Sequence, residues 1–204
     1  MNRNIKKLII GSIAALSLSI AGCGSVEVSR ISGEQEVALT DRWNDKDSEL
    51  VSAEMISDML SFPWRRNYSA TASKPVPTVI IQRVRNKSHE HIVVDAFIND
   101  LKRELIRSGS VDFVSSGAER RDIREERRDQ ELNATAHTAK QMGQETGADF
   151  ALSGSINSFV DQLDGKRVTA YQVDLKLIDM TTNREVWNGQ KKIKKLQQKK
   201  RFGF

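Results

Sequence analysis

Cys23 is the one residue whose chemical role is indicated by the sequence around it. It is the only cysteine among 204 residues, so the chain can form neither an internal disulfide nor a thiolate metal cluster. Cys23 directly follows the small residues Ala21 and Gly22, which end an apolar stretch. We therefore expect its thiol to be the attachment point of a covalent modification and not a catalytic group.

The 22 residues before Cys23 have the organisation of an export signal. Residues 1–7 are basic, and residues 8–20 form an apolar run of 13 residues. A helix of 13 residues spans roughly 20 Å, which is too short for a hydrocarbon core of about 30 Å. Residues 1–22 are therefore predicted to be a signal peptide and not a permanent transmembrane helix.

The site that precedes Cys23 resembles the bacterial lipobox, with Ile20 where Leu is usual. The resemblance implies a thioether-linked diacylglycerol on Cys23 and a further acyl chain on its new amino group. Two or more acyl chains give a stable membrane anchor. Gly24 in the next position resembles the enterobacterial signal for sorting to the outer membrane. The alternative is an ordinary signal peptide followed by an incidental buried cysteine.

The other residues that could do chemistry form no recognisable site. His89 and His91 lie two positions apart, which on a helix would prevent a shared metal ion; in an extended stretch they could share one, but no third ligand is indicated. His137 is expected to pack or cap locally. Ser153-Gly154-Ser155 lacks the spacing of a nucleophile elbow and is interpreted as a close-packed point in a strand. We therefore predict a protein without catalytic activity, cofactor or metal.

The formal net charge of +5 is not distributed evenly along the chain. The basic residues gather at the two ends, and residues 23–190 are mildly acidic, so a nucleic-acid partner is not predicted. The last 14 residues carry seven Lys and Arg and no acid. This basic segment, residues 191–201, could contact anionic lipid or an anionic cell-wall polymer, or it could be a frayed and solvated terminus.

The first half of the mature chain is predicted to be mainly helical. Residues 23–46 are polar without a period and are expected to be a lipidated tether. A helix is predicted to begin near Ser48 and to end at Phe62, because Pro63 disfavours helical geometry in the residue before it. A loop is expected up to Pro77, followed by a strand over residues 78–84. Further elements are expected in this order: a polar connection at 86–91, an amphipathic helix over 94–106 with Gly109 just past its end, a strand at 111–115, a charged helix over 119–132, and another helix that Asn133 caps and that runs to Glu145.

The rest of the chain is predicted to be β-structure. A long strand is expected over residues 148–160, and Asp164-Gly165 is a strong hairpin signal. Residues 169–179 alternate apolar with polar side chains, which indicates a half-buried strand, and residues 185–193 form the last one. The sequence thus predicts an α/β domain at residues 47–195, with a mixed sheet, a C-terminal antiparallel meander and flanking helices, followed by a basic tail at 196–204.

With these elements in place, the mature chain resembles the LpoB family of outer-membrane lipoproteins. The resemblance is carried by residues 41–45 (DRWND), 79–86 (VIIQRVRN), 147–150 (GADF) leading into 154–156 (GSI), and 171–180 (YQVDLKLIDM) followed by 185–187 (EVW). It implies a noncatalytic partner that binds a bifunctional penicillin-binding protein and stimulates its peptidoglycan synthesis. The fold implied is related to the N-terminal domain of TolB.

Two other functions remain open from the sequence. An envelope or secretion-assembly lipoprotein related to the curli-secretion lipoprotein would have a similar α/β body. A pore of that type would need membrane-spanning hairpins with strands of roughly 10 residues, and the sequence has no spare segments of that kind. A ligand-binding lipoprotein is the third possibility, because pockets are invisible in sequence.

Overall fold

The computed structural model describes residues 28–33, 38–135, 137, 138 and 144–198. The chain divides into two compact units, Met1–Val37 and Ala38–Phe204, and the second contains all the helices and strands discussed below. Among the described residues, no helix is both long enough and apolar enough to cross a membrane. Cys23 and the predicted signal peptide lie outside the described residues.

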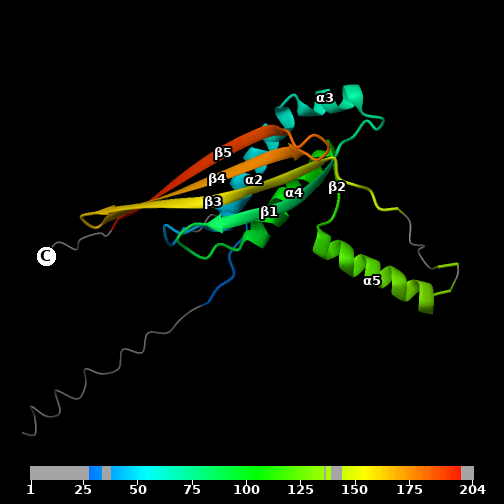
Figure 1. The fold of residues 1–204 in the computed structure, drawn as a ribbon. Helices are drawn as coiled ribbons and strands as arrows, with labels where there is room; N and C mark the ends of the chain where they lie inside the picture. Colours follow the sequence, from blue (N-terminus) through cyan, green and yellow to red (C-terminus); the bar gives the residue numbers. More distant parts are fainter. Residues whose placement is uncertain (1–27, 34–37, 136, 139–143, 199–204) are drawn as a thin grey trace, which may run out of the picture. The chain divides into compact units, whose positions relative to one another are not determined.

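The second unit is built on a five-stranded mixed sheet in the order β2-β1-β3-β4-β5 (Figure 1). The central strand β3 (Phe150–Leu163) pairs in parallel with β1 (Thr78–Lys87), which in turn pairs in parallel with the short β2 (Asp112–Phe113). On the other side, β3, β4 (Lys166–Asp179) and β5 (Glu185–Gln198) form an antiparallel meander. The predicted α/β class, the mixed sheet and the C-terminal meander are therefore confirmed.

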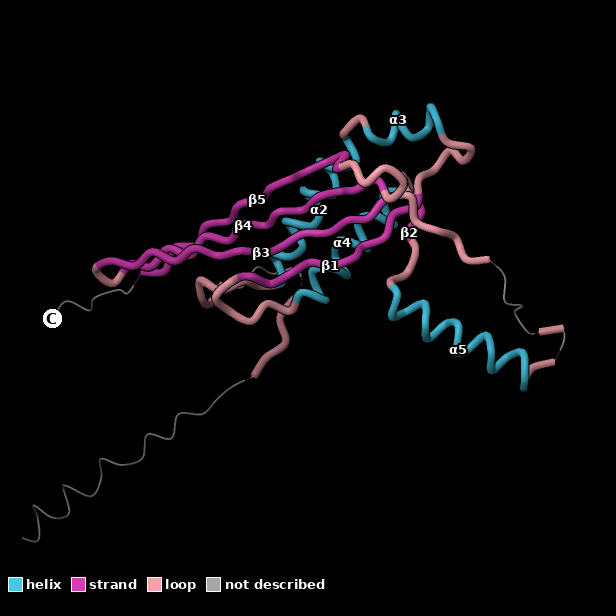
Figure 2. Tube along the Cα trace, viewed as in Figure 1, coloured by secondary structure: helices cyan, strands magenta, loops and turns pink. Residues whose placement is uncertain are grey.

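Two helices cover one face of this sheet, as Figure 2 shows. Helix α2 (Asp45–Ser61) packs against β5, and α4 (Val94–Ser108) packs against β1 and α2. The core between these helices and the sheet contains Val51, Met59, Phe97, Leu101, Leu105, Tyr171, Val173, Leu175 and Leu177, each at most 1% exposed. The odd-numbered apolar residues of β4 all point into this layer, so the alternation predicted for residues 169–179 is confirmed.

The start of α2 differs from the prediction and shortens the expected tether. Asn44, and not Ser48, caps the helix: its side chain accepts a hydrogen bond from the Asp47 amide, and the Asp47 side chain accepts one from the Asn44 amide. Ser48 is buried and accepts a hydrogen bond from the Trp43 indole at 2.7 Å. Residues 41–46 therefore belong to the folded body, although their polar sequence predicted a tether.

A short helix replaces part of the loop expected between Phe62 and Pro77. Helix α2 ends at Ser61 as predicted, but Pro63 adopts helical dihedral angles and starts α3 (Trp64–Thr71). The Trp64 ring is 3% exposed, packs edge-on against Phe150 and donates to the Met59 carbonyl at 2.7 Å. We attribute the helix to this buried aromatic contact, because the following Ser- and Thr-rich sequence has little helical propensity of its own.

Helix α5 (Gly117–Asn133) confirms the predicted charged helix and has no buried residue. Ser116 and Glu119 form a capping box at its start, and Glu119 also pairs with Lys102 of α4 at 2.7 Å. The further helix predicted to follow is not observed among the described residues. Asn133 lies inside α5, and residues 134, 135, 137, 138, 144 and 145 are not helical. Residues 136 and 139–143 of that segment lie outside the described part.

The β3–β4 turn confirms the hairpin predicted from Asp164-Gly165. Both residues have positive φ, 48° and 77°, and they join the paired residues Leu163 and Lys166. This two-residue turn suits Asp and Gly because they adopt positive φ at little cost. Beside this turn, β5 continues to Gln198, which is paired with Lys166, so residues 196–198 of the predicted tail, and the lysines at 191–195, lie in a paired strand.

Candidate functional site

The sheet face opposite the helices is polar and open. Successive residues of a strand point to opposite faces, so the buried Val173, Leu175 and Leu177 place Gln172, Asp174 and Lys176 on this open face. An antiparallel meander can have one face packed on the core and one face in water, which agrees with this arrangement. A function that requires surface recognition therefore has a broad polar face available.

A hollow of about 730 Å³ lies on the open face, and we refer to it as the basic hollow. Strands β1, β3, β4 and β5 all contribute to its lining: Gln82, Arg83, Arg85, Lys87, Ser153, Gly154, Ser155, Asp174, Leu175, Lys176 and Asn188. Gly154 is required for the close approach of β3 to β4, because a Cβ atom there would overlap the Asp174 carbonyl oxygen. The interpretation of Ser153-Gly154-Ser155 as a close-packed point is confirmed.

The only carboxylate that lines the basic hollow, Asp174, is occupied by neighbouring amides. Its two oxygens accept hydrogen bonds from Asn157 Nδ2 at 3.1 Å, from Gln172 Nε2 at 2.9 Å and from Gln190 Nε2 at 2.9 Å. These donors come from β3, β4 and β5, so they also hold the three strands in register on this face. Asp174 keeps its negative charge, but its oxygens are directed to these amides, and among the described residues it forms no ion pair with the cations around it.

Those cations come mainly from β1. Arg83, Arg85 and Lys87 are exposed, and among the described residues none of their side chains has a hydrogen-bond or ion-pair partner. A β-bulge between Ile81 and Val84 brings Gln82 and Arg83 to the same hollow. A row of unpaired guanidinium and ammonium groups fits carboxylates or phosphates, which arginine binds in a bidentate manner.

A second cluster lies on the helix-covered side, where the chain leaves residues 38–40 and joins the sheet. Asp41 is 7% exposed, and its carboxylate accepts a short hydrogen bond from the Thr169 hydroxyl and lies 3.0 Å from Arg167 Nε. The single proton of the Tyr171 hydroxyl is shared between the Glu90 carboxylate, at 2.5 Å, and the Asp41 carbonyl, at 3.1 Å. We call Asp41, Glu90, Arg167, Thr169 and Tyr171 the junction network.

The junction network perturbs the acidity of its members. The hydrogen bond from Thr169 keeps the pKa of Asp41 below its ordinary value, with help from Arg167 and against the opposing effect of burial. Burial, followed by the nearby Glu90 carboxylate, raises the pKa of Tyr171. Trp43 packs edge-on against the Tyr171 ring with 5.5 Å between ring centroids. The network therefore joins the end of the tether rigidly to β4, and we assign it a structural role.

The three histidines do not come together in a shared site. His89 and His91 precede α4 in an exposed loop, where the His89 ring lies 2.5 Å from the Ser158 hydroxyl, and His137 is exposed in a turn. Within residues 28–33, 38–135, 137, 138 and 144–198, no three His, Cys, Asp or Glu side chains are grouped to hold a metal ion.

Sequence reasoning did not single out the cations of β1; their alternation along the strand was the signal that could have revealed them.

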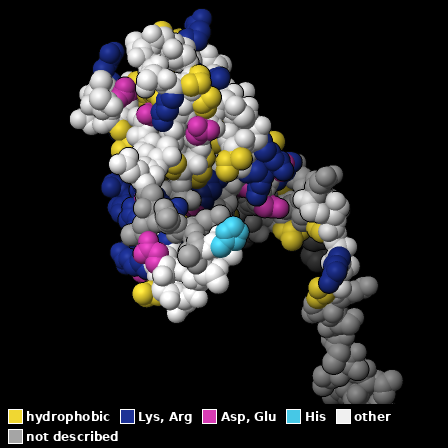
Figure 3. Space-filling model, turned by 90° about the vertical axis from the view of Figure 1, so that its right-hand side faces the viewer, with side chains coloured by type: hydrophobic (Ala, Val, Ile, Leu, Met, Phe, Trp, Pro, Cys, Tyr) yellow, Lys and Arg dark blue, Asp and Glu magenta, His cyan; other side chains and the backbone are white. Residues whose placement is uncertain are grey.

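Basic side chains on another face of the molecule are mixed with other types. Figure 3 shows Lys and Arg interspersed with Asp, Glu and hydrophobic side chains on the side it draws. Eleven of the described Lys and Arg residues have acidic partners, as in the pairs Lys74–Asp149 at 2.9 Å and Arg124–Glu145 at 2.7 Å, while others, such as Arg107 and Arg128, have none among the described residues. The feature particular to the basic hollow is that Arg83, Arg85 and Lys87, which have no partner among the described residues, follow one another along a single strand.

Comparison with protein families identifies the class of protein. The family model described as "Peptidoglycan-synthase activator LpoB" matches residues 47–193. This chain belongs to the LpoB family, a family of peptidoglycan-synthase activators. A comparison with curated proteins gives no match.

Solved structures of this family are among the similar folds. The LpoB C-terminal domain from Salmonella enterica matches with a TM-score of 0.43 and 15% identity, covering 72% of this chain and 98% of that one. The same domain from Escherichia coli gives a TM-score of 0.42 and 15% identity with the same coverage. The NMR structure of E. coli LpoB gives 0.40 and 14% identity, covering 88% of this chain and 85% of that one.

Proposed function

We propose that this protein is a noncatalytic outer-membrane lipoprotein, anchored through acylated Cys23, that faces the periplasm and activates a bifunctional penicillin-binding protein in peptidoglycan synthesis. The match of the LpoB family over residues 47–193 carries the proposal, because that family consists of peptidoglycan-synthase activators. In this organisation residues 1–22 are the signal peptide, and a tether from Cys23 to about Thr40 leads to the folded body.

The absence of catalysis is part of this proposal, and the state of two carboxylates, the half-buried Asp149 and the buried Asp41, supports it. Asp149 accepts from the Thr78 amide at 2.7 Å and from the Tyr68 hydroxyl at 3.0 Å, and it pairs with Lys74 at 2.9 Å. Asp41 is likewise occupied by Thr169 and Arg167. Carboxylates committed to structural partners in this way are poor candidates for acid–base chemistry.

We propose the basic hollow as the surface that contacts the synthase. Its unpaired Arg83, Arg85 and Lys87 offer charge-assisted hydrogen bonds to acidic side chains of a partner. Such contacts steer association and fix the register of an interface. The polar floor between these cations and β5 supplies further donors and acceptors.

The test is capture of the lipidated protein from crosslinked cell envelopes, followed by identification of the proteins bound to it. We expect a bifunctional penicillin-binding protein, and we expect Arg83→Glu with Arg85→Glu to lose it. The matched control is Arg121→Glu with Arg128→Glu, which makes the same charge change on two exposed residues of α5. Recovery of only a multimer of this chain would contradict the proposal and favour an assembly role.

The anchor is tested separately by growth with a clickable fatty acid. The wild-type protein should carry the label and fractionate with the outer membrane, and Cys23→Ser should carry none. A labelled Cys23→Ser protein, or an unlabelled wild-type protein, would contradict the anchor without affecting the capture experiment.

A further inference from the structure

Exposed apolar side chains gather at the end of the β3–β4 hairpin. Four of the fourteen large hydrophobic residues that are exposed among the described residues lie here: Phe159 (60% exposed), Val160 (44%), Leu163 (73%) and Leu196 (58%). Figure 1 shows that this part of the meander projects beyond α2 and α4, so no helix covers it. Single exposed hydrophobic residues are common on proteins, but a group of them at one projecting end is typical of an interaction site.

The strand register places most of this group on one face. Phe159 is opposite Ala170, Leu163 is opposite Lys166, and Val168 is opposite Leu196. Residues that are opposite one another in an antiparallel pair share a face, and so do residues two apart along a strand. Phe159, Leu163, Val168 and Leu196 therefore share one face, which also carries Asp161 opposite Val168; we call the four apolar residues the hairpin strip, and Val160 lies on the reverse face.

Cations border the hairpin strip. Lys166 is opposite Leu163, and Lys194 is opposite Ala170, so both exposed lysines share the face of the strip. Lys192 continues the series along β5, while Asp161 and Asp164 are the acidic residues near this end. Long lysine side chains beside exposed apolar groups suit the boundary between acyl chains and anionic headgroups, because their stems pack on apolar groups while the charge stays in water.

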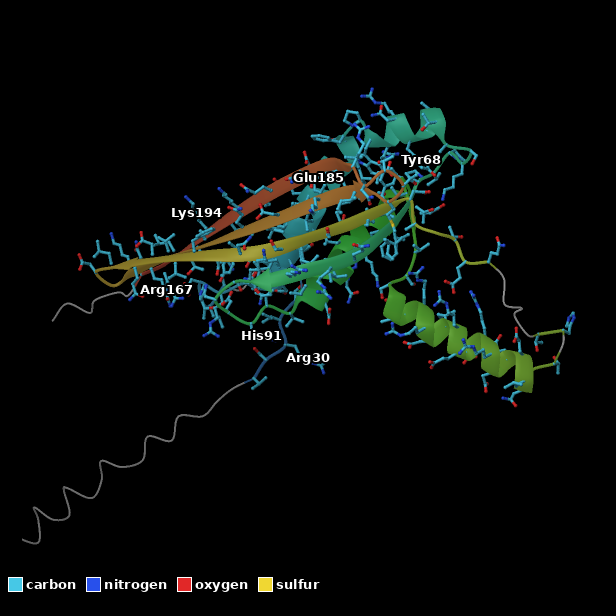
Figure 4. All side chains as sticks on the ribbon, in the orientation of Figure 1. Arg30, Tyr68, His91, Arg167, Glu185 and Lys194 are labelled. Carbon is cyan, nitrogen blue, oxygen red and sulfur yellow. The ribbon has the colours of Figure 1, made fainter. Side chains whose placement is uncertain are left out.

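The tether joins the body on the reverse face of the same hairpin. Asp41 contacts Arg167 and Thr169, and the Arg42 carbonyl accepts from Lys195 at 2.7 Å. Thr169 is opposite Val160 and is adjacent to Ala170, the partner of Phe159. Figure 4 shows Arg167 and Lys194 towards the hairpin end of the sheet, and Tyr68 and Glu185 at the opposite end.

The lengths of the hairpin and of the tether allow the hairpin end to reach the membrane. The strand from Thr169 to the turn at Asp164 rises about 16 Å, at about 3.3 Å per residue. A random-coil chain of the length between Cys23 and Thr40 averages roughly 25 Å end to end, and its full extension is about 60 Å. A body held on so short a tether, attached at the base of the hairpin, stays within reach of the bilayer that holds the acyl chains.

We infer that the hairpin strip inserts into the interfacial region of the bilayer that carries the Cys23 anchor and orients the body on that membrane. This inference rests on the lipid anchor in the proposed function. A second copy of the chain is a poorer occupant of the strip, because two strips face to face would bring the lysines of one β5 close to those of the other. An anionic bilayer satisfies both the apolar strip and its cationic border.

The test uses the full mature chain with Cys23→Ser, so that any binding comes from the body and not from acyl chains. It is sedimented with vesicles of phosphatidylethanolamine containing phosphatidylglycerol, and with vesicles of phosphatidylcholine alone. We expect binding to the anionic vesicles, weakened at least about tenfold by Phe159→Ser with Leu163→Ser. Lys166→Glu should weaken binding to the anionic vesicles alone, by roughly fivefold or more.

The matched control is Ile123→Ser with Leu132→Ser on α5, which removes two exposed apolar side chains from another surface and should leave binding unchanged. Near-ultraviolet circular dichroism and the unfolding midpoint establish that each variant is folded. As a second measurement, Leu163→Cys in the Cys23→Ser background provides a single thiol for an environment-sensitive fluorophore. Its emission should shift to the blue with anionic vesicles, and that of Leu132→Cys should not.

Failure of the Cys23→Ser chain to bind anionic vesicles, or equal binding by the Phe159 and Leu163 variant, would overturn the inference. So would sedimentation velocity showing that the strip holds two copies together while vesicle binding is indifferent to it. Capture of the synthase is measured independently, so loss of vesicle binding with capture intact leaves the proposed function standing. Loss of capture with vesicle binding intact would contradict the proposed function and leave the membrane contact of the hairpin strip standing.

Discussion

Replacing Asp41 tests how the tether end is held to the body. Asp41→Ala removes the acceptor of the buried Thr169 hydroxyl and the ion-pair partner of Arg167, whose side chain is 35% exposed. Leaving a buried donor unsatisfied costs about 1–3 kcal/mol, and a pair this exposed adds less than a fully buried one. We expect the free energy of unfolding to fall by about 2–3 kcal/mol.

Asp41→Asn separates the two contributions. The asparagine amide oxygen still accepts from Thr169, so only the charge interaction with Arg167 is lost and the change should be about 1 kcal/mol. A double-mutant cycle of Asp41→Ala and Arg167→Ala should give a coupling of roughly 1 kcal/mol. Urea unfolding of the Cys23→Ser chain, followed by tryptophan fluorescence, measures all of these values, because Trp43 packs next to the network on Tyr171.

Asp122→Ala serves as the control, since Asp122 is exposed on α5 and has no bonded partner among the described residues. It should change stability by less than about 0.5 kcal/mol. If Asp41→Ala were as mild as this control, or if the effects of the Asp41 and Arg167 substitutions were additive, the junction network would not hold the tether end.

Three further predictions concern acid stability and two glycines. The pKa of Asp41 is lowered chiefly by Thr169, and the pKa of Asp149 lies below its usual value because the hydrogen bonds from Lys74, Thr78 and Tyr68 outweigh the effect of burial, so both carboxylates stabilise the fold above their unfolded pKa of about 3.9. Urea unfolding at a series of pH values should show this stability being lost as the pH falls below about 4, and the loss should be less steep in Asp41→Ala. A stability that rose between about pH 4 and about pH 2.5 would contradict this prediction. Gly154→Val would overlap the β4 backbone and should lower the free energy of unfolding by about 2 kcal/mol or more, while Gly117→Ala, which meets no atom within 4 Å, should be neutral or slightly stabilising; equal midpoints for the two would argue against the close strand approach. Gly165→Val forces a β-branched residue to a φ of 77° and should cost about 1–2 kcal/mol by the same assay, and no change would mean that the turn is not of this type.

The meander could be predicted from the sequence because its signals are local. The period-two alternation around Tyr171 and Leu175 fixes which side chains face the core, and Asp164-Gly165 fixes the turn. The helix that ends before Pro63 and the charged helix up to Asn133 depend on equally local rules. In each case the residues that determine the element lie within a few positions of one another.

The predicted and observed elements differ where contacts between residues far apart in the sequence determine the structure. Asp41 is in a polar stretch without a period, and its partners Thr169 and Tyr171 lie 128 and 130 positions away. Helix α3 depends on the contact of Trp64 with Phe150. Local propensity contains no information about such packing, so the tether was predicted too long and α3 was predicted as a loop.

The candidate site was harder to predict than the fold. Arg83 and Arg85 are ordinary solvent-facing residues in the sequence of β1, and their importance arises because the nearby Asp174 is occupied by amides from three strands. Only the assembled sheet shows that these cations lack partners among the described residues.

The proposed activation of a peptidoglycan synthase, without catalysis by this chain itself, can be measured with purified proteins. The most direct measurement is the rate at which a purified bifunctional penicillin-binding protein from the same bacterium polymerises lipid-linked precursor, with and without saturating Cys23→Ser chain. We predict a faster rate with the wild-type hollow, no increase with Arg83→Glu and Arg85→Glu, and no product from the chain alone. An active synthase whose rate is the same with and without the chain that carries the wild-type hollow would contradict the proposed activation.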